Sequence, residues 1–167
     1  MKDSILSGKR ILAVDDEPDV LALLEEEITA ACKGCTIDKA TTYEAAFERL
    51  ISQQYDLVVL DIMGVRGFDL LSVAVNRKFK VAMLTAHALS PENLKRAFEM
   101  KAMSYLPKEK LGEIVPFLED MLKYEYLTGW KRLMGTLKDF FDMRFETDWE
   151  KKTGLPWQEW GKYGGRV

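Results

Sequence analysis

Five short apolar runs divide the first two thirds of the chain. They lie at residues 11–14, 35–38, 57–60, 80–84 and 104–106. Segments with apolar residues at helical spacing follow them, at residues 20–31, 43–51, 68–75, 94–100 and 114–122. The first, third and fourth runs are continuously apolar, which is typical of strands covered on both faces. The pattern predicts an α/β fold, with a doubly wound five-stranded parallel sheet and an added C-terminal helical segment.

The last part of the chain has a different composition. Residues 124–167 hold all four tryptophans and ten of the 18 aromatic residues, so we divide the chain into domain 1–123 and an aromatic-rich extension, 124–167. From Leu118 to Trp149 the apolar residues recur mostly every three or four positions, which predicts one helix or two helices broken near Thr128 and Gly129. This stripe needs a covering surface, either the first domain, a second copy in a homodimer, or another protein. Residues 154–167 are interpreted as an irregular terminus.

Charge and hydropathy exclude several classes of function. The 167 residues carry 24 Lys and Arg against 27 Asp and Glu, and neither part of the chain has the basic excess typical of nucleic-acid binding. No apolar run approaches the roughly 18 residues that a membrane-spanning helix needs. Membrane-surface binding by the extension is disfavoured because acidic and basic residues are balanced along it. The N-terminus lacks the apolar core of a signal peptide, so a cytoplasmic location is expected.

Polar residues with complementary chemistry follow four of the five predicted strands. Asp15 and Asp16 follow the first strand, Asp61 the third, Thr85 the fourth and Lys108 the fifth. In a parallel sheet the carboxyl ends of the strands meet at one edge, so these side chains are expected to converge. Three carboxylates suit a hard cation such as Mg²⁺. A lysine and a threonine opposite them suit the charge of a phosphoryl group, which Asp61 would accept as a nucleophile.

These motifs, in this order, resemble the response regulator receiver domain of two-component signalling. The resemblance covers residues 9–123 and rests on four segments: 11–18 with its Asp-Asp pair, 57–63 around Asp61, 84–86 around Thr85, and 105–108. It implies a flavodoxin-like receiver fold in which Asp61 is the phospho-acceptor. It further implies that Asp16, Asp61 and the Met63 carbonyl coordinate Mg²⁺, that Asp15 supports the metal, and that Thr85 and Lys108 bind the phosphoryl group. Tyr105 occupies the position of the family's switch aromatic.

Three positions depart from the family's usual pattern. Gly64 stands where a proline usually follows the methionine, although Gly67 keeps the glycine three residues further on. Glu109 replaces the proline that commonly follows the lysine, so a cis peptide bond is not expected there. Lys101 replaces the glycine of the turn into the fifth strand. The last change affects the surface between the fourth helix and fifth strand, which the family usually uses for output.

Other chemistries fit the sequence less well. Haloacid dehalogenase-like phosphatases also form an aspartyl phosphate, but their second aspartate corresponds here to Met63, so a switch is favoured over an enzyme. Cys32 and Cys35 follow a predicted helix, whereas a redox pair is expected to precede one. His87, the single histidine, is expected at the surface beside the site.

The resulting hypothesis is a response regulator phosphorylated on Asp61 by a histidine kinase or a phosphotransfer protein. Its output would be protein association or a change in dimer packing, and no DNA-reading domain is expected in residues 124–167. Two alternatives stay open: a phosphorelay intermediate, and a receiver-like scaffold that acts without phosphate.

Overall fold

The computed structural model describes residues 4–155, and these form a five-stranded parallel sheet with helices on both faces. The strands are β1 (Arg10–Val14), β2 (Thr36–Ala40), β3 (Leu57–Asp61), β4 (Lys80–Thr85) and β5 (Ser104–Pro107). Their order in the sheet is β2-β1-β3-β4-β5, with every neighbouring pair parallel. The predicted fold class is therefore confirmed.

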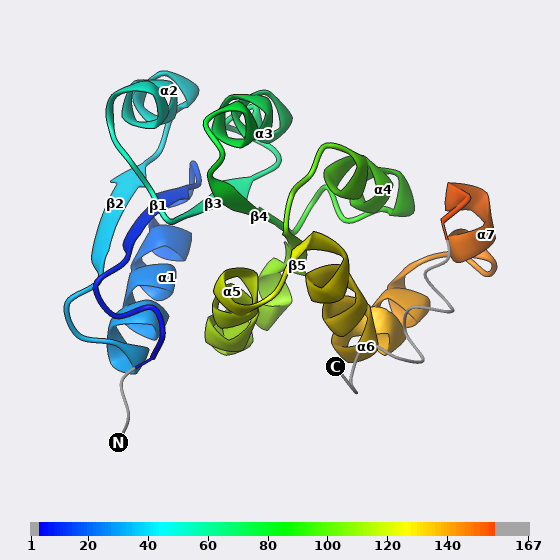
Figure 1. Ribbon diagram of the computed structural model, residues 1–167. Coiled ribbons are helices and arrows are strands. Elements are labelled where there is room, and N and C mark those ends of the chain that lie inside the picture. Colours follow the sequence, from blue (N-terminus) through cyan, green and yellow to red (C-terminus); the bar gives the residue numbers. More distant parts are fainter. Residues whose placement is uncertain (1–3, 156–167) are drawn as a thin grey trace.

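Of the first five α-helices, two cover one face of the sheet and three cover the other. Helices α1 (Pro18–Ala31) and α5 (Ile114–Lys123) lie on one face, and α2 (Tyr43–Ser52), α3 (Gly67–Asn76) and α4 (Pro91–Glu99) lie on the other (Figure 1). All five residues of the central strand β3 are buried, as expected for a strand covered on both sides. The hydrophobic core therefore lies on both faces of the sheet.

Local sequence explains where several helices begin. The hydroxyl of Thr42 accepts a hydrogen bond from the backbone of Ala45 at the start of α2, and Ser90 does the same for Asn93 at the start of α4. Pro18 and Pro91 occupy the first turns of α1 and α4, where a missing backbone N–H costs nothing. These signals place the helix boundaries within a few residues of those predicted from spacing.

Lys101 adopts the backbone conformation that the turn before β5 requires. Its φ is 74°, in the left-handed region that usually favours glycine. Its ammonium lies 4.9 Å from the centroid of the Tyr126 ring, and this cation–π contact helps to offset the unfavourable backbone conformation. The turn therefore keeps its geometry despite the substitution. All peptide bonds between the described residues are trans, including the bond after Lys108.

The extension forms two helices, although the break lies elsewhere than predicted. A 3₁₀ helix, η1 (Lys108–Glu113), leads into α5, and α6 (Tyr126–Arg144) and α7 (Trp149–Thr153) follow. The expected break near Thr128 and Gly129 is wrong, because both lie inside α6. The chain instead turns at Tyr124 and Glu125, which have extended backbones. The spacing hides this break because Leu122 and Tyr126 are four residues apart, as on a continuous helix.

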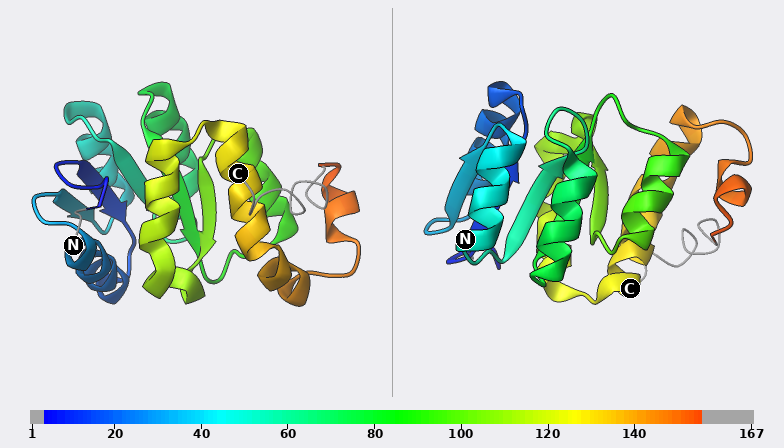
Figure 2. Two further views of the ribbon diagram at one scale, coloured as in Figure 1. Left: turned by 60° about the horizontal axis from the view of Figure 1, so that its bottom comes forward. Right: turned by 90° about the horizontal axis from the view of Figure 1, so that it is seen from above.

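Helix α6 packs against its own receiver domain and covers the β5 edge of the sheet (Figures 1 and 2). Its buried residues are Trp130, Leu133, Met134, Leu137 and Phe141. The apolar stripe is thus covered within the chain. The rest of the predicted irregular terminus, residues 156–167, lies outside the described residues. Between residues 4 and 155, no helix is both long enough and apolar enough to cross a membrane.

Candidate functional site

The register of the sheet brings the predicted site residues to one edge. Asp61 at the end of β3 pairs with Leu84 of β4, and Thr85 pairs with Pro107 of β5. Thr85 directly follows Leu84 in the chain, and Lys108 directly follows Pro107. Because all the strands are parallel, their carboxyl ends meet at the same edge, where Asp15 and Asp16 also emerge from β1.

Lys108 lies among three acidic side chains. Its Nζ is 2.8 Å from Asp15 Oδ2, 3.5 Å from Asp61 Oδ1 and 3.7 Å from Glu17 Oε1. The lysine side chain is 11% exposed, so its charge is largely shielded from water and depends on these partners. Burial lowers the pKa of Lys108, but hydrogen bonding to Asp15 and the charge of Asp61 outweigh it and raise the pKa. Lys108 therefore stays a cation at the centre of the site.

The two acids after β1 have different environments. Asp15 is fully buried, and its Oδ1 accepts a hydrogen bond from the backbone of Glu17 at 2.9 Å. This bond orients the Asp15 carboxylate in the turn between β1 and α1, and no side chain caps the first turn of α1. Asp16 is exposed. Glu17 directly follows these two acids in the sequence, but only the fold shows that it approaches Lys108.

Burial makes Asp61 unusually easy to protonate. The carboxyl group is nearly inaccessible to water, and desolvation together with the charges of Asp15 and Asp16 raises its pKa to about 7, although Lys108 opposes the shift. Desolvation likewise raises the pKa of Asp15. The crowded carboxylates destabilise one another, and a further positive charge would relieve this repulsion.

The acid cluster fits a divalent cation. Asp15, Asp16 and Asp61 each offer a carboxylate oxygen, and these oxygens all lie within 4.8 Å of one another. The fully buried Asp15 Oδ2 lies 2.8 Å from Lys108 Nζ, and a carboxylate oxygen has a second lone pair that can bind a cation. Hard oxygen ligands of this kind suit Mg²⁺. The role of the Met63 carbonyl in metal binding stays a prediction.

The loop after β3 depends on two glycines. Gly67 begins α3 so close to β3 that an added Cβ would lie 2.1 Å from the Asp61 carbonyl oxygen. Gly64 has a φ of 87°, and an added Cβ would lie 2.3 Å from Asp16 Oδ2. A proline, whose φ is fixed near −65°, does not fit this conformation of the loop. Gly64 therefore lets the loop pass directly beside the Asp16 carboxylate.

Thr85 and Tyr105 are connected through the loop after β4. Thr85 is buried, and its Oγ1 accepts a hydrogen bond from the backbone of Ala88 at 3.0 Å. The fully buried Tyr105 donates its hydroxyl to the Ala88 carbonyl at 3.1 Å and accepts from the Ser90 backbone at 3.2 Å. The residue predicted to bind the phosphoryl group and the predicted switch aromatic thus share one loop.

The remaining candidates lie outside this arrangement. His87 is exposed on the same loop, as expected. Cys32 lies at the end of α1 and donates to the Ile28 carbonyl, while the Cys35 thiol donates to the Cys32 carbonyl. Neither cysteine lies at a helix N-terminus, where a thiolate would be stabilised.

Comparison with known proteins identifies the family. Residues 11–118 match the response regulator receiver domain, so the chain belongs to that family, whose members act in two-component signal transduction. It is 36% identical over 105 residues to the sensory transduction protein LytT of Bacillus subtilis, a match that covers 59% of this chain and 42% of LytT. It is also 38% identical over 85 residues to the transcriptional regulatory protein TcrA of Mycobacterium tuberculosis, covering 48% and 33% of the two chains. The match thus spans less than half of either relative.

Solved structures support the same fold. The CheY-like receiver domain protein from Methanospirillum hungatei aligns with a TM-score of 0.58 and 25% identity, over 70% of this chain and 98% of that one. A LuxR-family response regulator from Aurantimonas aligns with a TM-score of 0.62 and 24% identity, over 70% and 86% of the two chains. Receiver domains typically bind Mg²⁺ at an acidic pocket and interact with histidine kinases or phosphotransfer proteins.

Proposed function

We propose that this protein accepts a phosphoryl group on Asp61 from a histidine kinase or a phosphotransfer protein, with Mg²⁺ held by Asp15, Asp16, Asp61 and the Met63 carbonyl. The observation that carries the proposal is the position of Asp61, which is buried at the end of β3 with Asp15 on one side and Lys108 Nζ at 3.5 Å. A bound metal would neutralise the acids and leave the Asp61 carboxylate ionised as a nucleophile.

The transfer step uses groups of this chain. A carboxylate oxygen of Asp61 attacks the phosphorus atom of a phosphohistidine, and the P–O bond forms as the P–N bond breaks, with the electron pair leaving on the imidazole nitrogen. Lys108 stabilises the negative charge of the phosphoryl oxygens, and the Thr85 hydroxyl donates a hydrogen bond to one of them.

The residue two positions after the acceptor favours a switch over a substrate-hydrolysing enzyme. Met63, two residues after the acceptor, has no proton to donate, so the site lacks a general acid at the position that haloacid dehalogenase-like phosphatases use.

We propose that signalling proceeds by protein association and not by DNA binding, because residues 124–167 carry eight basic and seven acidic residues.

The test is a measurement of intact mass after incubation with Mg²⁺ and acetyl phosphate. One phosphoryl group is expected on the wild type and none on Asp61→Asn. Asp56→Asn is a matched control, because Asp56 is an exposed carboxylate just before the same strand. A wild type without adduct and without response in a parallel Mg²⁺ titration would overturn the proposal and favour a phosphate-independent scaffold.

A further inference from the structure

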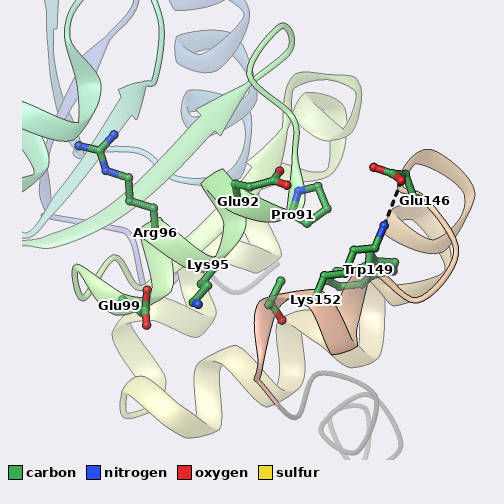
Figure 3. A pocket seen from close by; sticks show the side chains of 9 residues that line it. Pro91, Glu92, Lys95, Arg96, Glu99, Glu146, Trp149 and Lys152 are labelled. Carbon is green, nitrogen blue, oxygen red and sulfur yellow. Dashed lines mark hydrogen bonds and ion pairs between the residues drawn. The ribbon is translucent and has the colours of Figure 1, made fainter.

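A cleft of about 280 Å³ lies between α4 and α7 (Figure 3). Residues of α4, among them Lys95 and Glu99, form one wall, and Trp149 and Lys152 of α7 form the other. Pockets for cofactors and substrates usually measure roughly 300–1,000 Å³. The cleft lies just below that range, so it suits one or two side chains of a polypeptide better than a cofactor.

The walls of the cleft have the chemistry that an indole ring prefers. Pro91 and Trp149 offer apolar ring surfaces. The methylene stems of Lys95 and Lys152 add apolar surface, while their ammonium groups stay in water or approach the face of a bound ring. Carboxylates that accept the N–H of an indole also line the cleft, namely Glu92, Glu99 and Glu146. An aromatic side chain with a polar edge therefore fits the cleft best.

Helix α7 is held in place by contacts outside the cleft. Trp149 Nε1 donates a hydrogen bond to Asp142 of α6 at 2.8 Å, and Lys138 of α6 pairs with Glu150 at 3.1 Å. These contacts position the α7 wall before anything binds between α7 and α4. Because the cleft is preformed, a ligand binds there without first paying for its assembly.

The chain leaves α7 at the edge of this cleft. Thr153 lines the cleft, and its hydroxyl accepts a hydrogen bond from the backbone of Leu155 at 3.3 Å. Gly154 has a φ of 74°, which ends α7 in the left-handed conformation and turns the chain. Leu155 then packs against the hydrophobic core. The residues that follow therefore start beside the cleft.

The next residues of the sequence carry two tryptophans within reach of the cleft. Residues 156–160 are Pro-Trp-Gln-Glu-Trp. Because an extended chain spans at most about 3.6 Å per residue, the Cα of Trp157 lies within about 14 Å of that of Thr153. Such a short tether gives an effective concentration on the order of millimolar. A contact too weak to hold a separate peptide is therefore enough to hold this segment for much of the time.

We propose that residues 156–160, which lie outside the described residues, bind in the cleft between α4 and α7 with one of their indole rings against Trp149. Glu159, the one charged residue of this segment, would lie near Lys95 and Arg96 of α4. The bound segment would tie α7 to α4 and close the cleft to other molecules. The inference does not depend on the proposed function.

Fluorine NMR of the full chain labelled with 5-fluorotryptophan tests the docking. The chain has four tryptophans, and the variants Trp157→Phe and Trp160→Phe assign the two signals of the segment. We expect a gadolinium chelate in solution to broaden the signal of the bound ring roughly threefold less than that of free fluorotryptophan, which corresponds to a segment docked for most of the time. The buried Trp130 provides the shielded reference.

Two results of this measurement would overturn the proposal. If both signals of the segment broaden as strongly as free fluorotryptophan, the segment does not occupy the cleft, which is then open to another protein. If the shielding disappears on dilution, a second copy of the chain supplies the segment.

Charge reversal in the cleft tests where the segment binds. Lys95→Glu removes a cation beside the ring and repels Glu159, so it should lower the ratio of docked to free segment roughly three- to tenfold. Lys33→Glu is the matched control, because it makes the same change of charge in the exposed loop after α1, far from α7 (Figure 1). It should leave the shielding unchanged, and urea unfolding checks that both variants are folded. Shielding that survives Lys95→Glu would place the segment elsewhere and overturn the proposal.

Discussion

At the scale of single residues, Gly64 connects the acceptor loop to the metal site. An alanine there would place its Cβ 2.3 Å from Asp16 Oδ2 and would also have to adopt a φ of 87°. We expect Gly64→Ala to displace the Asp16 carboxylate and lower Mg²⁺ affinity, besides costing about 1 kcal/mol of stability through backbone strain. Calorimetric Mg²⁺ titration measures the affinity.

A matched variant separates the strain from the steric clash. Gly34 has a φ of 86°, but no atom lies within 4 Å of its added Cβ. Gly34→Ala should therefore lose similar stability and keep the Mg²⁺ affinity of the wild type. If both variants bind Mg²⁺ like the wild type, the close approach of Gly64 to Asp16 has no role in metal binding.

The pKa of Asp61 predicts a pH-dependent stability without metal. Burial raises this pKa from 3.8 to about 7, so between these values the native state binds a proton that the unfolded state lacks. The free energy of unfolding contributed by Asp61 therefore falls as pH rises across this window. Asn does not titrate, so the stability advantage of Asp61→Asn should grow between pH 5 and pH 8, by on the order of 2 kcal/mol. Urea unfolding in EDTA measures it, and parallel pH profiles would contradict it.

At the scale of elements, Trp130 anchors α6 by a polar and an apolar contact. Its indole nitrogen satisfies the Ala102 carbonyl, and its ring packs on Phe98. Trp130→Phe keeps an aromatic ring but leaves that carbonyl without its donor, which should cost about 1–3 kcal/mol in urea unfolding. Leu127→Ala, at a half-exposed position on the same helix, should cost less. Equal losses would mean that the indole hydrogen bond does not stabilise α6.

The elements also show what sequence patterns can predict. The strand ends are readable because continuous apolar runs stop at Asp15, Asp61 and Thr85, and parallel topology then brings them together. The break before α6 is not readable, because Leu122 and Tyr126 keep helical spacing across it. Gly129 suggests a break, yet the burial of Trp130 beside it outweighs the low helix propensity of glycine.

Other features could not be predicted because they depend on contacts between residues far apart in the sequence or on helices too short to show a period. The pairing of Glu109 with Arg144 joins residues 35 positions apart, and no periodicity marks it. Phe141 is a second example. In the sequence it is one of many apolar residues at helical spacing, and only the fold shows that its ring lies against that of Tyr105. The short helices η1 and α7 are likewise invisible to spacing, because six and five residues are too few to show a helical period.

At the scale of the whole molecule, the extension completes the receiver domain. Removing residues 124–167 would uncover the β5 edge and the apolar surface around Phe98 and Tyr105, both now covered by α6. Unpaired sheet edges and large apolar patches promote association. We therefore expect the chain ending at Lys123 to unfold at lower urea concentration and to self-associate with rising concentration in light scattering. At the same concentrations the full chain should stay monomeric. A full chain that dimerises, beside a shorter chain that does not, would show instead that the extension serves a second copy.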